Sequence, residues 1–494
     1  MCERVDLEVE EERREFLHQL EPLVSDWYGV YPDLLDFFRK KEIDRLLSDF
    51  IEFENSYSGS RPFLKFVLRC GYEDEPEVDE VGKPLLRHTT PVHRAIRRRF
   101  SRRDANLPLL KNLFEIYNRY DVNYTDEFGL THFHVACEYG LYDVVETFLE
   151  LGQDPNCLPR ESGASSIDPP LHLALRNAEF LVADLLLKSR ADPNLPNAEG
   201  LTPLHILCKS YHRNRHDLLK KFLNINDKMN QLVQIDAKDK SGRTPLQLAV
   251  ANFSLDTIDI LLDRGADLSG FVFPNESYFG EIAKTQFYDS NFKLRLTTDA
   301  LTVVEHLQAR GYELDRSGAR TILRFFAEHE VFEKPGQLDE DWYINETFAK
   351  KAKKTLMRSG LTLHDWIQLR PEEASKAVTF GEYHKFACSK KLSRLPSPRK
   401  SPRDFRRACA LRLAETAARR FCRRWAIDCF WELTGYRLPI LCCETIIDKL
   451  MNDDLCRICL AAVSQSREDG ETKCKNDRIV KCIPARGRKS QKKS

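Results

Sequence analysis

The chain lacks the long apolar stretches that membrane-spanning segments need. No run of about 18 apolar residues occurs in its 494 residues, so we expect no helix that crosses a bilayer. The first residues, Met1 to Asp6, also lack the basic start and apolar stretch of a secretory signal. The fifteen cysteines are an odd number on a long chain, which does not suit a small disulfide framework. We therefore expect a reducing compartment, the cytoplasm or the nucleus.

The chain has no net charge, because Lys plus Arg and Asp plus Glu both number 76. Nothing in the overall charge favours binding to nucleic acid or to a membrane surface. Gly (21) and Pro (23) are too scarce for a collagen-like or linker-type protein. The hydrophobic share of 42% is enough for packed cores, and the length predicts about three domains.

The sequence also lacks catalytic signatures. It contains no Gly-x-x-x-x-Gly-Lys phosphate loop, no Gly-x-Ser-x-Gly elbow and no His-Glu-x-x-His zinc motif. We therefore expect no enzyme activity, no catalytic residue, no cofactor and no bound metal. A binding function is the alternative that the remaining features favour.

One short phrase recurs along the first half of the chain. It reads Thr-Pro-Val-His at 90–93, Thr-His-Phe-His at 131–134, Thr-Pro-Leu-His at 202–205 and Thr-Pro-Leu-Gln at 244–247, with Pro-Pro-Leu-His at 169–172. The last positions of successive phrases are 41, 38, 33 and 42 residues apart. Thr is suited to cap a helix, and Pro after it occupies the first helical position without losing a hydrogen bond. The phrase thus predicts the start of a helix in each unit.

A second amphipathic helix follows each phrase, for example at 144–149, 181–186 and 258–262. Gly precedes the Thr by two residues at Gly129, Gly200 and Gly242, where a tight turn can use positive φ. At the end of one second helix Arg190 stands where Gly is usual, so we expect backbone strain there. The histidines of the phrases are expected to hold the stack together. The acidic stretch 73–80 is expected to be a solvated loop.

These spacings, caps and turns resemble ankyrin repeats over about residues 60–270. The resemblance implies an all-α solenoid of paired helices joined by β-hairpin turns, with a concave surface that binds a protein partner. We expect the following organisation: an N-terminal helical cap (1–58), five to six repeats (59–270), an irregular helical extension (271–390), a linker (391–403), a small helical domain (404–462) and a disordered basic tail (463–494).

Residues that the repeat fold does not need are the candidates for target binding. They lie at turns or at the ends of the predicted first helices. They are Phe128, Glu138, Tyr139, Arg176, Asn177, Lys209, Lys238 and Lys240. Phe128 and Tyr139 are the sharpest candidates, because aromatic anchors are enriched at interface hot spots.

The C-terminal region, from Trp431 through the Leu-Pro pair at 438–439 to Cys459, resembles the PRANC domain. This is an F-box-like module found after ankyrin repeats in proteins of poxviruses and some insects. The resemblance implies docking on the Skp adaptor of a cullin–RING ubiquitin ligase. The matching positions are Leu438, Pro439, Ile446, Ile447, Leu450 and Leu455. Alternatively, these residues only form the core of their own domain. Glu444 also follows Pro439 by five residues, where F-boxes place an acid two residues after the Pro.

Two further features leave alternatives open. Thirteen Lys/Arg and two acidic residues lie between Lys390 and Arg424, which could form a nucleic-acid patch. However, apolar residues recur among them at helical spacing, which favours an amphipathic helix with a basic outer face. Cys456-x-x-Cys459 could bind zinc, but a structural site commonly needs two such pairs, and Cys442 and Cys443 are adjacent instead. We favour buried thiols.

Three functions therefore remain. The first is a substrate receptor that holds a target and presents it to a ubiquitin ligase. The second is an ankyrin scaffold or sequestering protein without ligase coupling. The third, binding to nucleic acid through 390–424, is the least favoured.

Overall fold

The computed structural model describes residues 6–53, 61–97, 103–158, 167–210, 215–275, 278–279, 291–332, 343–396 and 405–462. The chain divides into two compact units, residues 1–245 (unit 1) and 246–494 (unit 2), and each is described by itself. The predicted tail (463–494) and most of the predicted linker lie outside the described residues.

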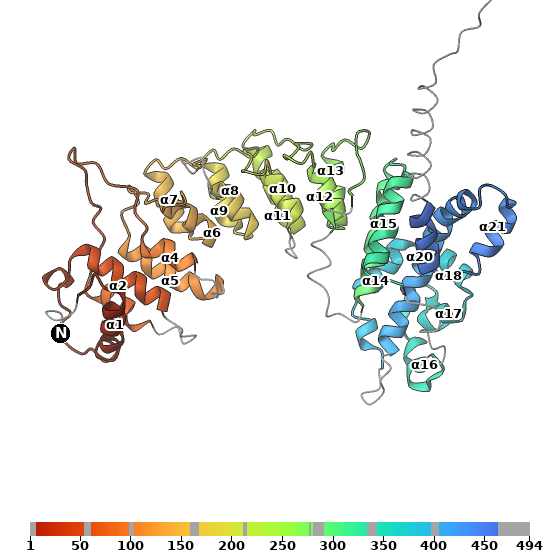
Figure 1. Cartoon of the computed structure of the whole chain (residues 1–494), viewed down its shortest axis with the longest axis horizontal. Coiled ribbons are helices and arrows are strands. Elements are labelled where there is room, and N and C mark those ends of the chain that lie inside the picture. The colour runs from red at the N-terminus through yellow and green to blue at the C-terminus, as the bar shows by residue number, and fades with distance from the viewer. Residues whose placement is uncertain are drawn as a thin grey trace, which may run out of the picture. The chain divides into compact units, whose positions relative to one another are not determined.

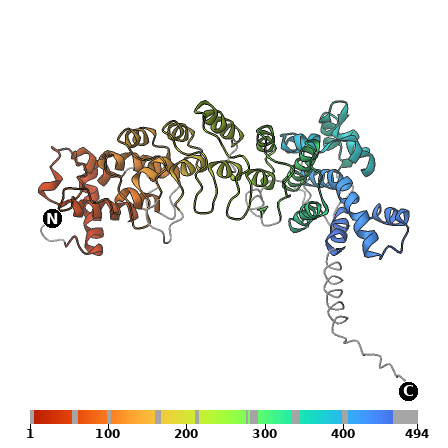
Figure 2. The same cartoon turned by 90° about the horizontal axis from the view of Figure 1, so that it is seen from above.

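Unit 1 is built from helices that follow one another as antiparallel pairs (Figures 1 and 2). Its helices are α1 (Glu10–Ser25), η2 (Leu34–Asp36), α2 (Lys40–Phe53), α3 (Pro62–Arg69), α4 (Pro91–Arg97), α5 (Arg103–Ile116), α6 (His132–Tyr139), α7 (Tyr142–Glu150), α8 (Pro170–Arg176), α9 (Phe180–Lys188), α10 (Pro203–Lys209) and α11 (Arg215–Lys228).

The packing follows the repeat. The first helices α2, α4, α6, α8 and α10 pack on one another in sequence, and the second helices α3 and α5, then α7, α9 and α11, do the same. Within the predicted N-terminal cap (1–58), α1 packs against α2 and α3, and α2 packs on α4, so this part of the chain is continuous with the stack. Leu46 and Leu47 of α2 and Leu64 of α3 are almost fully buried.

Among the described residues of unit 1, four turns share one construction, at 79–83, 126–130, 197–201 and 239–243; we call them fingertips. In each, the first residue (Asp or Asn) donates its backbone N–H to the carbonyl of the fifth residue. Its side chain accepts the backbone N–H groups of the third and fifth residues. Gly at the fourth position has φ between +77° and +87°. The fingertip at 79–83 begins inside the acidic stretch and was not predicted from the sequence.

The recurring phrase caps the first helices as predicted. The Thr131 hydroxyl accepts the N–H of His134 at 3.2 Å, and the backbone N–H of Thr202 donates to Nδ1 of His205 at 3.1 Å. The other ring nitrogen of His205 reaches the fingertip that precedes the next repeat phrase, since Nε2 donates to the Arg243 carbonyl at 2.9 Å. These histidines are structural, as expected. The helix α8 has no side-chain cap. Asp168, which precedes it, accepts a hydrogen bond from Asn197 Nδ2 at 2.7 Å.

Several second helices are followed by a residue in the left-handed conformation. Gly152 has a φ of +90° at this position, and Arg190 has a φ of +71° in the equivalent place after α9. The strain expected at Arg190 therefore corresponds to a real left-handed conformation, which costs a non-Gly residue roughly 1–2 kcal/mol.

Unit 2 begins with one further pair, α12 (Pro245–Ala251) and α13 (Leu255–Asp263). It continues with α14 (Phe292–Ala309), α15 (Arg316–Glu328), α16 (Glu346–Ala352), α17 (Leu363–Gln368), α18 (Pro371–Ala377), α19 (Phe380–Cys388), η6 (Leu392–Arg394), α20 (Phe405–Leu433), α21 (Ile440–Ile447) and a helix over 452–462. A two-stranded antiparallel hairpin, β1 (Leu356–Arg358) and β2 (Leu361–Thr362), precedes α17.

One hydrophobic core joins the predicted extension, linker and C-terminal domain. It contains Leu294 of α14, Trp366 of α17 and Leu413 of α20. Leu392 and Leu395, at 0% and 1% exposure, belong to the same core. Residues 391–396 of the predicted linker (391–403) therefore pack into a core that α20 shares, whereas the predicted boundary at 403/404 lies outside the described residues. The expected fold class, an all-α solenoid of paired helices with a helical C-terminal region, is confirmed.

Candidate protein-binding surfaces

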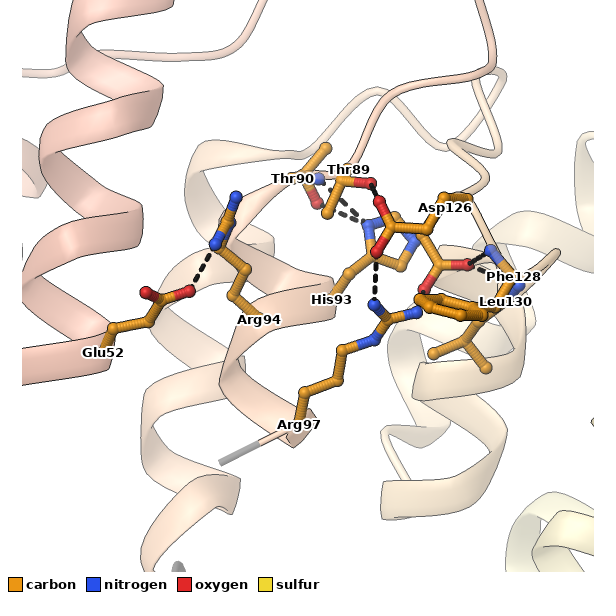
Figure 3. A network of polar contacts seen from close by, with 10 residues as sticks. Glu52, Thr89, Thr90, His93, Arg94, Arg97, Asp126, Phe128 and Leu130 are labelled. Carbon is orange, nitrogen blue, oxygen red and sulfur yellow. Dashed lines mark hydrogen bonds and ion pairs between the residues drawn. The ribbon is translucent and has the colours of Figure 1, made fainter. Parts of the chain in front are cut away.

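Phe128 stands at a fingertip with its ring 51% exposed. The Arg97 guanidinium lies over this ring, 4.1 Å from the centroid, and also pairs with the buried carboxylate of Asp126 (Figure 3). The Asp126 side chain in turn holds the backbone N–H groups of Phe128 and Leu130 at 2.8 and 2.9 Å. The apolar ring is thus presented to solvent in a fixed position rather than on a loose loop.

Polar groups surround this ring. Glu127 accepts from Arg97 at 2.7 Å and from the Thr89 hydroxyl at 3.2 Å, and the Arg97 bond lowers the pKa of the Glu127 carboxyl. Arg94, one turn before Arg97 on α4, pairs with Glu52 of α2 (Figure 3). We call Thr89, Arg94, Arg97, Glu127 and Phe128 the Phe128 surface. An apolar centre with a charged rim is the usual anatomy of a protein interface.

Tyr139 does not fulfil the prediction of an exposed anchor. Its side chain is only 8% exposed at the end of α6, where Asn106 of α5 donates to its hydroxyl at 3.4 Å. The Arg103 guanidinium lies 5.4 Å from its ring centroid. Tyr139 therefore packs between consecutive pairs. Beside it Glu138 is half-buried, and burial raises the pKa of its carboxyl despite the nearby Arg103.

The other residues predicted to bind the target are fully or partly exposed to solvent. Arg176 is exposed and pairs with the buried Asp168, and Asn177 is half-buried and donates to the Leu173 carbonyl at 3.0 Å. Lys209 is half-buried at the end of α10. The exposed Lys238 and Lys240 flank Asp239, the first residue of the last fingertip.

Unit 2 carries a second candidate surface around α21, the helix labelled at the edge of this unit in Figure 1. Several large apolar side chains are exposed there. They are Trp431 (36%), Tyr436 (61%), Ile440 (40%), Leu441 (71%) and Ile446 (38%), and we call them the α21 face. Trp431 and Tyr436 contact edge to face with centroids 4.9 Å apart, and Trp431 Nε1 donates to the Leu438 carbonyl at 3.0 Å. A cluster of exposed apolar side chains of this kind marks an interaction site.

The six predicted docking residues divide between this surface and the interior. Ile447 and Leu455 are fully buried, so the prediction that they dock is wrong and the alternative reading as core residues applies to them. Pro439 and Ile446 are exposed, whereas Leu438 and Leu450 are half-buried. Ile440 and Leu441 were not predicted, although they form an apolar run directly after Pro439 that could have indicated them.

Residues 405–424 of the basic stretch lie in the helix α20, whose apolar residues are largely buried. Several of its arginines bind within unit 2: Arg406 donates to the Leu395 carbonyl at 2.7 Å, Arg419 to the Ile447 carbonyl at 3.1 Å, and Arg423 pairs with Asp448 at 2.5 Å. These contacts use charges that a nucleic-acid site would need to keep free.

The described cysteines of the C-terminal region are mostly buried. Cys422, Cys429, Cys456 and Cys459 are buried, and side-chain hydrogen bonds join Cys422 to Cys456 and Cys429 to Cys459. Arg316 also donates to the Cys429 sulfur at 3.5 Å. Bonds from Cys459 and Arg316 lower the pKa of the Cys429 thiol to about 7.

Comparison with known proteins identifies the repeats. The family model of ankyrin repeats (3 copies) matches residues 171–270. A putative ankyrin repeat protein of Fowlpox virus (strain NVSL) is 28% identical over 147 residues, covering 29% of this chain and 40% of the viral protein. The B-cell lymphoma 3 protein homolog of Mus musculus is 29% identical over 205 residues, 40% of each chain. A putative ankyrin repeat protein of Rickettsia bellii is 29% identical over 113 residues, covering 22% of this chain and 31% of that protein.

The matched parts thus span two fifths or less of the length of these three relatives. The chain contains ankyrin repeats, and ankyrin repeats indicate protein partners. Among the residues described above, no helix combines the length and apolar character needed to cross a membrane.

Proposed function

We propose that the chain is a protein-binding adaptor in which the ankyrin repeats hold a target protein. The observation that carries this proposal is the Phe128 surface: a half-exposed aromatic ring, fixed by Arg97 and Asp126, on a scaffold built for protein binding. Binding energy at interfaces concentrates in such anchored aromatic and arginine side chains. The proposal includes a location in the cytoplasm or the nucleus.

The second part of the proposal concerns the α21 face, which we infer to be a docking site for the Skp adaptor of a cullin–RING ubiquitin ligase. The support is the exposed apolar set Ile440, Leu441 and Ile446 after the Leu-Pro pair, together with the resemblance to a PRANC domain. The chain would then act by proximity, holding the target close to a ligase that supplies the chemistry.

A scaffold or sequestering protein is the second candidate function. Its support is that Ile447 and Leu455, two of the six residues assigned to docking, instead fill the interior of unit 2. The unusual spacing of Glu444 from Pro439 points the same way. In that case the α21 face would bind another partner.

Replacing Phe128 by Ala is expected to weaken target capture by at least about tenfold, because an anchored aromatic at a hot spot carries 2 kcal/mol or more. Affinity capture from a cell lysate with quantitative mass spectrometry measures this. The matched control is Leu181→Ala, which removes a 68% exposed apolar side chain from the second helix α9. If the two variants lose the same captured proteins to the same extent, or if neither loses any, a target site at Phe128 would be contradicted.

Replacing Leu441 or Ile446 by Asp is expected to abolish recovery of Skp and cullin while the chain stays folded, since both side chains are exposed. The measurement is a pull-down with purified Skp–cullin complex, with circular dichroism as the folding check. Val272→Asp, another exposed apolar position of unit 2, is the control. If the wild-type chain recovers no Skp, ligase coupling is wrong and the scaffold function stands.

A further inference from the structure

Three side chains with metal-binding atoms meet where α14 and α19 pack against each other. Asp299 comes from α14, and His384 and Cys388 lie four residues apart on α19, so they share one face of that helix. Nδ1 of His384 lies 2.7 Å from Oδ1 of Asp299, and the Cys388 sulfur lies 3.7 Å from Nε2 and 3.9 Å from Nδ1 of the same ring. One donor atom from each residue lies within 4.8 Å of the other two.

The surroundings suit a bound ion that reaches the site from solvent. Cys388 is exposed, while the side chains of Asp299 and His384 are only 17% and 25% exposed. Packing holds both helices in place, because Leu294 of α14 and Tyr383 and Phe386 of α19 belong to the core of unit 2. The three donors are therefore positioned by packed helices rather than by loops, which favours a preformed site.

The chemistry of the donors selects the metal. A thiolate with an imidazole is a soft set that favours zinc over magnesium or calcium, which prefer oxygen alone. Three protein ligands leave the fourth position of a tetrahedral zinc ion to water. Two zinc bonds of about 2.0–2.1 Å at a tetrahedral angle span roughly 3.3 Å, so the contact between His384 and Asp299 needs to open by only about 0.6 Å.

We propose that Asp299, His384 and Cys388 bind a zinc ion that fastens α19 to α14. The site differs from the zinc site that Cys456-x-x-Cys459 suggests, because it uses none of those cysteines. It also does not depend on the adaptor function, since it uses no residue of the Phe128 surface or of the α21 face. Zinc bound only to the folded chain would stabilise unit 2 by mass action.

Cobalt(II) substitution of the full chain tests the proposal, because a tetrahedral cobalt–thiolate site has an absorption band from charge transfer that oxygen ligands do not give. We expect this band in the wild type and in Cys442→Ser, which removes an exposed cysteine of α21. We expect its loss in Cys388→Ser. A zinc competition assay with a chelator should show affinity at least about tenfold lower for Cys388→Ser and for Asp299→Asn than for the wild type.

Folding provides a second measurement. Zinc is expected to raise the thermal midpoint of the wild type and of Cys442→Ser, but not that of Cys388→Ser. A cobalt–thiolate band that survives in Cys388→Ser and disappears in Cys459→Ser would assign the metal to the buried cysteines and overturn the proposal. The absence of any band in the wild type would overturn it as well.

Discussion

Lowering the pH from 7 to 5 is expected to unfold unit 1, because the histidines of its repeats are buried in the neutral state. Burial lowers the pKa of His93 to about 3 and the pKa values of His134 and His172 to about 4. Burial also lowers the pKa of His132 far below its usual value and that of His205 to a lesser degree. In the unfolded chain each has a pKa of about 6.5.

The sign follows from proton uptake. A histidine whose folded pKa is depressed binds its proton mainly after unfolding, so its stabilising effect is complete above pH 6.5 and is lost as the pH falls. At pH 5 each such residue with a folded pKa near 4 or below costs about 2 kcal/mol of unfolding free energy. Several together approach the 5–15 kcal/mol that holds a typical domain folded.

Three groups of unit 1 act in the opposite direction. The hydrogen bond with Asp44 raises the pKa of His88, and burial raises the pKa values of Asp74 and Glu138. All three therefore bind protons more tightly in the folded state and favour folding at lower pH. They reduce the net effect, but the buried repeat histidines outnumber them.

The chain itself supplies the replacement that tests this prediction. In the last phrase Gln247 occupies the histidine position, and its Nε2 donates to the Val272 carbonyl at 2.8 Å, as His172 Nε2 does to the Leu201 carbonyl at the same distance. The double variant His172→Gln/His205→Gln should keep these bonds without the titrating ring. We expect it to lower the pH midpoint of unfolding by about 0.5–1 pH unit.

Hydrogen exchange followed by mass spectrometry over a pH series resolves unit 1 from unit 2. His18→Gln, which changes an exposed histidine of α1, is the control and should leave the midpoint unchanged. An unaltered midpoint in the double variant would mean that other groups drive acid unfolding.

Replacing Leu392 by Ala is expected to destabilise unit 2 by about 2–5 kcal/mol, because Leu392 is fully buried and its loss leaves a cavity in a packed core. In a flexible linker the same change would cost less than about 0.5 kcal/mol. Urea unfolding of the full chain measures the difference. The adjacent Ser393→Ala, at an exposed position, is the control. Equal unfolding midpoints for the two variants would contradict the shared core.

The parts of the fold that sequence reasoning predicted are those fixed by local chemistry. A Thr cap, a Pro in the first turn and a Gly with positive φ act within a few residues, so the repeat phrase locates its helix directly. Phe128 was named as an aromatic residue that the repeat fold does not need; it is exposed, and its role in target binding stays a prediction.

The features that the sequence did not predict depend on contacts between distant residues. Tyr139 is buried, and Asn106, 33 residues earlier, donates to its hydroxyl; the residue pattern within α6 does not indicate this contact. Leu392 and Leu395 follow a region that reads as the start of a linker, yet their partners lie on α14 and α20. Asp299 and His384 are 85 residues apart and form no sequence motif.

The four fingertips share a backbone that is held by their first and fourth residues, while the third side chain points outward and takes no part in the turn. This third position is occupied by Val81, Phe128, Glu199 and Ser241, all exposed. Mutation at these sites can therefore alter what the protein recognises at little expense to its folding. Such a row gives evolution, or an engineer who grafts new side chains, a set of modular contact points on an unchanged framework.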